Sequence, residues 1–214
     1  MTTLQTYVYQ LRKAMSRNFP GELSGECLAT RPPGYVLRVP EERIDSVCFE
    51  RFIHAGRTLF YDGHPLEARV KLNSALALWR GEAMANVQRG QRLQAHAVGL
   101  EELRIEGLQL RIAAEMRLGR QRECISELRT IVANYPLNEW FHAQLMCALT
   151  IVGRRGEALA AYRDLRRVLG EELGLDPSPE LQRFHMEILS ADAEALIERV
   201  PDSPGSLSMS ELVP

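Results

Sequence analysis

The sequence predicts a mainly α-helical fold, in which repeated helical hairpins follow a short N-terminal segment of one helix and one β-hairpin. Two observations predict the repeats: a glycine phrase that occurs three times, and apolar residues at helical spacing after each glycine. A third, a turn rich in proline and glycine near the N-terminus, predicts the β-hairpin. Each copy of the phrase has a Glu four residues after the glycine and a small residue five after it. The copies lie at residues 63–68, 119–124 and 153–158.

The second and third copies have the spacing of a tetratricopeptide repeat. Their glycines, at positions 119 and 153, are 153 − 119 = 34 residues apart, which is the period of this pair of antiparallel helices. Apolar residues lie nine, twelve and sixteen positions after each glycine, on one face of a helix. They are Leu72, Ala75 and Trp79, then Leu128, Ile131 and Tyr135, then Tyr162, Leu165 and Leu169. Three stacked repeats are about the minimum for a stable array.

The first interval is longer than the period. The glycines at positions 63 and 119 are 119 − 63 = 56 residues apart, a surplus of 22 over 34. We assign the surplus to residues 80–101. Gly81 and Gly90 predict an irregular loop over residues 80–90, with a helix stop after Trp79. A long helix without proline is expected over residues 91–118.

The C-terminal end predicts one more helix. Ser178 is a favourable N-cap and Pro179 suits the first helical position, so a closing helix is expected to run to about residue 199. Residues 200–214 are rich in Ser, Pro and Gly, which predicts a disordered tail. We expect one domain over residues 43–199, made of three tetratricopeptide-like repeats and this closing helix.

Composition excludes several classes of protein. The chain is 45% hydrophobic and 25% charged, typical of a soluble globular protein. It has no apolar run near the roughly 20 residues of a membrane span and no signal peptide, so we expect a cytoplasmic protein with no membrane partner. The four cysteines are scattered without metal-ligand spacing, and we expect no metal and no cofactor.

The N-terminal helix, over residues 3–17, combines an apolar stripe with a basic polar face. Leu4, Val8, Leu11 and Met15 form the stripe. The helix has no acidic residue, and its polar groups suit phosphates and base edges. The residues expected to contact DNA are Thr2, Thr6, Tyr9, Gln10, Lys13 and Arg17, with Arg12 beside the stripe and suited to a phosphate.

A β-hairpin is expected next. Two strand candidates, residues 26–30 and 35–39, flank the sequence Arg-Pro-Pro-Gly of residues 31–34. Arg31 at this turn could enter a minor groove. Residues 1–40 carry five cations and two acids, 5 − 2 = +3, whereas the whole chain is at −2, so the remainder carries −5. The N-terminal segment is therefore the part suited to a polyanion.

These residues resemble a known family. Residues 4–15 and 30–37 look like the recognition helix and wing of the Streptomyces antibiotic regulatory protein family. Residues 44–189 look like its bacterial transcriptional activator domain, a three-repeat tetratricopeptide array. The phrases that carry this second match are residues 75–81, 100–104, 139–149 and 172–177.

The resemblance implies a transcriptional activator that binds promoter repeats, with the helix in the major groove and Arg31 in the minor groove. It also implies contact with RNA polymerase and control of a biosynthetic gene cluster, and it leaves room for a homodimer on DNA. Members of the family have a sheet and two helices ahead of the recognition helix. Here Met1 adjoins that helix, so we expect a partial winged-helix domain over residues 1–42, with its apolar stripe exposed.

No catalytic constellation is present. The five histidines stand singly, without the companion residues of hydrolase or metalloprotease motifs. Glu67, Glu123 and Glu157 occur once per repeat and are too far apart for paired-carboxylate chemistry. We therefore expect no enzyme. The repeats alone would also fit an alternative, a protein-interaction scaffold that does not bind DNA.

Overall fold

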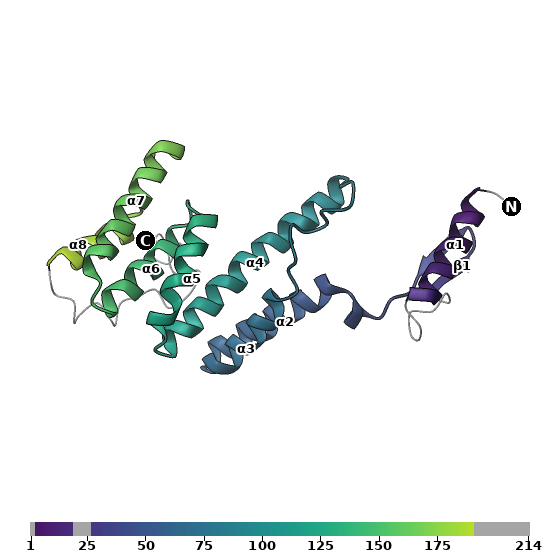
Figure 1. The fold of residues 1–214 in the computed structure, drawn as a ribbon, viewed down its shortest axis with the longest axis horizontal. Coiled ribbons are helices and arrows are strands. Elements are labelled where there is room, and N and C mark those ends of the chain that lie inside the picture. The colour runs from purple at the N-terminus through teal and green to yellow at the C-terminus, as the bar shows by residue number, and fades with distance from the viewer. Residues whose placement is uncertain (1–2, 19–26, 191–214) are drawn as a thin grey trace, which may run out of the picture. The chain divides into compact units, whose positions relative to one another are not determined.

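The computed structural model describes residues 3–18 and 27–190 and divides the chain into two compact units, Met1–Cys48 and Phe49–Pro214 (Figure 1). Thr2, Glu26, the tail over residues 200–214 and the last part of the expected closing helix lie outside the described residues.

The first unit contains one long helix and one β-hairpin. Helix α1 covers Thr3–Asn18, as the apolar stripe predicts. Strands β1 (Leu28–Arg31) and β2 (Gly34–Leu37) are antiparallel, with Arg31 opposite Gly34. A hydrogen bond from the Arg38 N–H to the Cys27 carbonyl, 2.7 Å long, closes the open end of the hairpin. The short 3-10 helix η2 (Glu41–Arg43) follows.

The second unit is an array of three helical hairpins with a closing helix (Figure 1). The hairpins are α2 with α3, α4 with α5, and α6 with α7, and α8 follows the third. Their bounds are α2 Asp45–Tyr61, α3 Pro65–Leu76, α4 Gln91–Arg117, α5 Gln121–Asn134, α6 Glu139–Ile151, α7 Arg155–Leu173 and α8 Pro179–Ser190. The expected fold class is confirmed.

The three repeated glycines end the first helix of each hairpin in the same way. Gly63, Gly119 and Gly153 have φ angles of 84°, 75° and 79°. This left-handed region costs other residues roughly 1–2 kcal/mol. In each case the next residue's N–H returns to a carbonyl five residues earlier, as Arg154 does to Leu149 at 2.8 Å. The pattern is a Schellman motif, which satisfies carbonyls that the end of a helix leaves unpaired.

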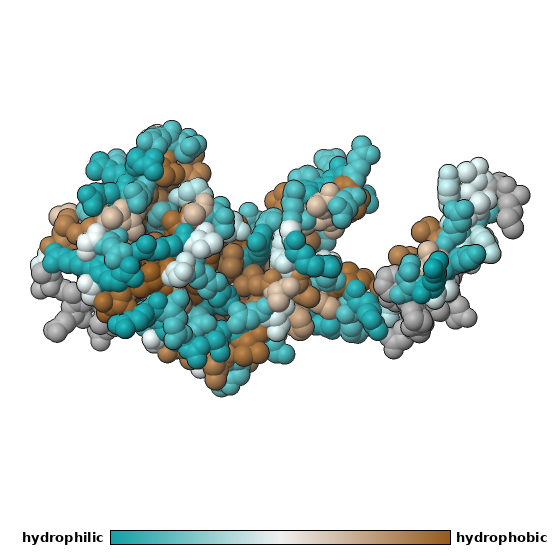
Figure 2. All heavy atoms as spheres, in the orientation of Figure 1, coloured by the Kyte–Doolittle hydropathy of each residue, from teal (hydrophilic) through white to brown (hydrophobic). Residues whose placement is uncertain are grey.

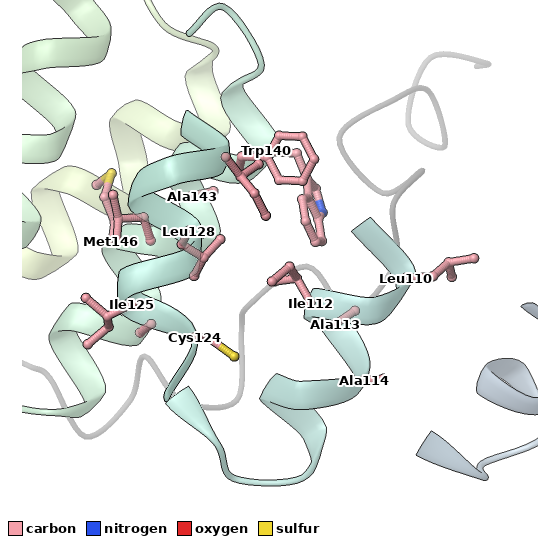
Figure 3. Close-up of a cluster of buried hydrophobic side chains, with 14 of the residues drawn as sticks. Leu110, Ile112, Ala113, Ala114, Cys124, Ile125, Leu128, Trp140, Ala143 and Met146 are labelled. Atoms are coloured by element: carbon pink, nitrogen blue, oxygen red, sulfur yellow. The ribbon is translucent and has the colours of Figure 1, made fainter. Parts of the chain in front are cut away.

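The residues that follow the glycines form the core. The small residues Ala68, Cys124 and Ala158 are buried. Leu72, Leu128 and Leu165 are fully buried, and each such side chain stabilises the fold by about 1.5–3 kcal/mol. Figure 3 shows side chains of α4, α5 and α6, among them Ile112, Leu128 and Trp140, gathered in this core.

Two further glycines allow close packing of α2 that the repeat phrase does not predict. A Cβ atom on Gly56 would lie 2.6 Å from Cγ of Leu72 in α3. A Cβ atom on Gly107 in α4 would lie 2.5 Å from Cδ1 of Ile53. Both distances are shorter than van der Waals contact, so α2 approaches its two neighbours where a side chain is missing.

One expected helix end and one expected N-cap differ from the structure, whereas α8 begins at Pro179 as expected. Helix α3 ends at Leu76, before Trp79, because Trp79 instead packs edge-on against Phe49, with 5.4 Å between the ring centroids. The Ser178 hydroxyl makes no hydrogen bond within the described residues. Its N–H donates to the Glu139 carboxylate at 2.8 Å, which ties the start of α8 to α6. The irregular loop over residues 80–90 and the long helix after it are confirmed.

Candidate nucleic-acid interface

The polar face of α1 is formed as the sequence predicts. Five of the six residues expected opposite the apolar stripe are described by the structure, all of them exposed, and they lie within about one third of the helix circumference. They are Thr6, Tyr9, Gln10, Lys13 and Arg17. The structure therefore places these five together on one surface of the first unit.

Cationic side chains predominate on the described part of α1 and the hairpin. The described residues 3–18 and 27–40 contain five cations and no Asp or Glu. Among the described residues, the side chains of Lys13, Arg17 and Arg31 have no ion-pair partner. The visible face of this unit is mostly hydrophilic in Figure 2. The described part of α1 and the β1–β2 hairpin therefore presents a positive surface that contains no acidic side chain.

Arg31 is exposed at the end of β1, next to the turn. Pro32 and Pro33 form the two-residue turn, and the bond between them is cis. Neither proline has a backbone N–H, so the turn offers no competing donors beside the guanidinium. Arg31 is the cationic side chain that lies nearest the turn in sequence.

Arg12 differs from the other candidate residues because the hairpin already binds it. Its Nε and Nη2 atoms donate to the Leu28 carbonyl, at 2.9 and 2.7 Å, and Nη2 also donates to Oγ1 of Thr30 at 3.0 Å. Its Cζ atom lies 5.9 Å from the centre of the Tyr35 ring. Sequence reasoning missed these contacts. Its one relevant signal was the position of Arg12 beside the apolar stripe.

The apolar stripe of α1 is only partly exposed. Leu4 and Leu11 are 61% and 54% exposed, as expected. Val8 is only 6% exposed and Met15 is half-buried, so the expectation of an exposed stripe is wrong for Val8. The reason is the hairpin, which covers the side of α1 that carries Arg12, one turn from Val8.

His142 is a buried histidine of the array whose pKa is altered. His142 is 3% exposed, and its Nε2 atom lies 3.1 Å from the Pro136 carbonyl oxygen. Burial lowers the pKa of His142 below its ordinary value of 6.5. Because it is buried, His142 is not available to a partner at the surface of the array.

Residues 3–18 and 27–190 contain no group of three or more His, Cys, Asp or Glu side chains arranged to hold a metal ion. None of the helices in these ranges has the length and apolar character to cross a membrane.

Comparison with known proteins identifies the array. Residues 44–189 match the bacterial transcriptional activator domain. The regulatory protein DnrI of Streptomyces peucetius is 35% identical over 98% of this chain and 78% of its own length. The transcriptional regulator RedD of Streptomyces coelicolor is 33% identical over 98% of this chain, which spans 61% of RedD.

A solved structure shows the same fold. The structure of Mycobacterium tuberculosis EmbR in complex with a low-affinity phosphopeptide superimposes with a TM-score of 0.74 at 30% identity, over 91% of this chain and 52% of EmbR. The match to the activator domain covers most of the chain, and DnrI matches it nearly end to end. The chain therefore belongs to the Streptomyces antibiotic regulatory protein family, the transcriptional regulators that carry a bacterial transcriptional activator domain.

Proposed function

We propose that this regulator binds promoter DNA through α1 and the β1–β2 hairpin, and that the array transmits activation. The observation that carries the proposal is the acid-free surface of α1, where five exposed polar and cationic residues lie on one face. Membership of a family of transcriptional regulators supports it.

The dimensions of the helix suit the major groove. An α-helix with its side chains is about 10–12 Å wide, and the major groove is about 12 Å wide. With α1 in the groove, Gln10 and Lys13 face the base edges, where an amide suits adenine and an ammonium suits guanine. Arg17 and Thr6 lie one turn to either side and donate to phosphates. Thr2, which the sequence pattern also assigns to DNA contact, lies outside the described residues.

The hairpin contributes a second contact. Arg31 lies next to a turn without N–H donors, and it enters the minor groove beside the helix. A cationic side chain there gains from the negative potential of a narrow groove. Residues 1–42 then act as the DNA-binding domain.

Residues 43–199 form the regulatory domain in this proposal. The array contacts RNA polymerase or a second copy of the chain, as suits a surface built from stacked repeats. The protein acts in the cytoplasm, without catalysis, as an activator of a biosynthetic gene cluster. An interaction scaffold without DNA binding is the alternative that the following experiment separates from this function.

The experiment measures binding of the full chain to duplexes from the promoters beside its own gene, across a series of salt concentrations. Lys13→Ala and Arg31→Ala should each weaken binding and reduce the slope of log K against log salt by about one. Arg122→Ala is the matched control, because Arg122 is an exposed array cation without an ion-pair partner among the described residues. Identical binding isotherms for the unaltered chain and the three variants would favour the interaction scaffold that does not bind DNA.

A further inference from the structure

We propose that Arg12 is a positioning residue, which fixes the hairpin against α1 and so aims Arg31, and that it is not itself a DNA contact. The inference rests on the proposed function for its consequence in DNA binding. It also has a consequence in the free protein, which can be measured without DNA.

Three hydrogen bonds link Arg12 to strand β1. Two of the guanidinium nitrogens share the Leu28 carbonyl and one of them also reaches Thr30. A guanidinium presents its donors in a rigid planar fork, so three bonds fix both the distance and the orientation between helix and strand. A lysine ammonium in the same place has the same charge but no such fork.

The contacts of Arg12 lie close to Arg31, which is the last residue of β1. Thr30 is the residue before Arg31 in β1, and it pairs with Tyr35 across the hairpin. The guanidinium therefore contacts side chains of one cross-strand pair, Thr30 by a hydrogen bond and the ring of Tyr35 at 5.9 Å. The next pair, Arg31 with Gly34, closes the turn. Fixing one pair fixes the direction of the next, because strand pairing is continuous.

The hydrogen bonds of Arg12 matter because few apolar side chains are buried among the described residues of the first unit. Val8 and Cys27 are its buried hydrophobic side chains within the described residues. Such a small core gives little resistance to movement of a hairpin on a helix. The hydrogen bonds of Arg12 supply a directional restraint that apolar burial, which has no preferred direction, does not.

Arg12→Lys separates a positioning role from a phosphate contact. A phosphate contact needs only the charge, so the lysine variant would then bind DNA like the unaltered chain. A positioning role needs the fork, so Arg12→Lys should resemble Arg12→Ala. In both variants Arg31 should no longer contribute to DNA binding. The fold loss of affinity between 50 and 200 mM salt should then be about 3.5 times smaller than for the unaltered chain.

A double-variant cycle tests the link to Arg31. If Arg12 acts through Arg31, then adding Arg31→Ala to Arg12→Lys should cause no further change of affinity or salt slope. Independent DNA contacts would give additive losses and a slope reduced by about two for Arg12→Ala with Arg31→Ala. Additivity would overturn the proposal. Lys13→Ala serves as the control that should remain additive with Arg31→Ala.

Hydrogen exchange of the free protein provides a readout without DNA. The Arg38 amide, bonded to the Cys27 carbonyl at 2.7 Å, should exchange faster in Arg12→Lys and Arg12→Ala and be unchanged in Lys13→Ala. Unchanged exchange in Arg12→Lys would overturn the positioning role whatever the DNA result. If the unaltered chain binds no promoter DNA, the proposed function fails, and faster exchange in Arg12→Lys would still support the restraint of the hairpin.

Discussion

The two units of this protein are stabilised by different means. The array has a continuous core to which all seven helices from α2 to α8 contribute, whereas the first unit buries Val8 and Cys27 among its described residues. The array therefore depends on apolar packing, and the helix-hairpin unit on directed polar contacts. A regulator can combine a rigid scaffold with a surface whose geometry a few hydrogen bonds determine.

The largest expected effect is the removal of a core aromatic ring. Phe141 is fully buried and packs against Trp140, with 5.4 Å between the ring centroids. Phe141→Ala should lower the free energy of unfolding by about 3–5 kcal/mol. Urea unfolding followed by far-UV circular dichroism measures it. Val70→Ala, at a side chain that is 53% exposed, is the control and should stay within about 0.5 kcal/mol. A similar loss in both variants would contradict the packing argument.

Hydrogen exchange compares the two units directly. The Arg154 amide bonds to the Leu149 carbonyl at 2.8 Å in the array, and the Arg38 amide bonds to Cys27 at 2.7 Å in the hairpin. The bonds are similar in length, so a difference in exchange reports the surrounding packing. We expect the Arg154 amide to exchange roughly a hundredfold more slowly than the Arg38 amide, because local opening needs less free energy where few apolar side chains are buried. Equal rates would remove the distinction between the units.

A pair of glycine substitutions tests the repeat turns. Gly119 has φ 75°, and Gly119→Ala should destabilise the array by about 1–2 kcal/mol through backbone strain alone, since a Cβ atom meets nothing within 4 Å. Gly99 also has open space but lies inside α4. There, Gly99→Ala should stabilise the fold by up to about 1 kcal/mol. Thermal unfolding should show a lower Tm for Gly119→Ala and a higher Tm for Gly99→Ala. A lower Tm in both variants would contradict the explanation from backbone conformation.

The smallest effect is a dependence on pH. Burial lowers the pKa of His142 from 6.5. Just below pH 6.5 the imidazole is therefore protonated more fully in the unfolded chain than in the folded chain. The free energy of unfolding therefore falls as the pH drops below 6.5 and is recovered above it. His142→Phe should reduce the difference in stability between about pH 7.5 and about pH 5. Urea midpoints at both values measure it. Part of the dependence should remain with His185, whose pKa burial also lowers.

Much of the array could be predicted because its rules are local. The glycine phrase determines where each first helix ends, and the offsets of nine and twelve residues identify buried positions such as Leu128 and Ile131. The end of α3 could not be predicted in this way, since Trp79 leaves the helix to pack against Phe49, thirty positions earlier in the chain. Local periodicity carries no information about that contact.

The candidate interface was predictable to a smaller extent. Helical spacing places Thr6, Gln10 and Lys13 on one exposed face, and the structure agrees. The environment of Arg12 was not predictable, because its acceptors are 16 and 18 residues away in the sequence. A cation on a polar helix has the same appearance in the sequence whether it faces DNA or a neighbouring strand.

The Schellman turns make the array tolerant of changes in length. Each turn closes its hydrogen bonds within six residues, as Arg120 does with Glu115, so it depends on nothing upstream. Helices of 17, 27 and 13 residues, α2, α4 and α6, end in the same geometry. Insertions near residues 80–101 can therefore lengthen the start of α4 while the register of every later helix is unchanged. We expect relatives to differ in length near residues 80–101. A peptide tag inserted in the loop over residues 80–90 should leave the repeats folded.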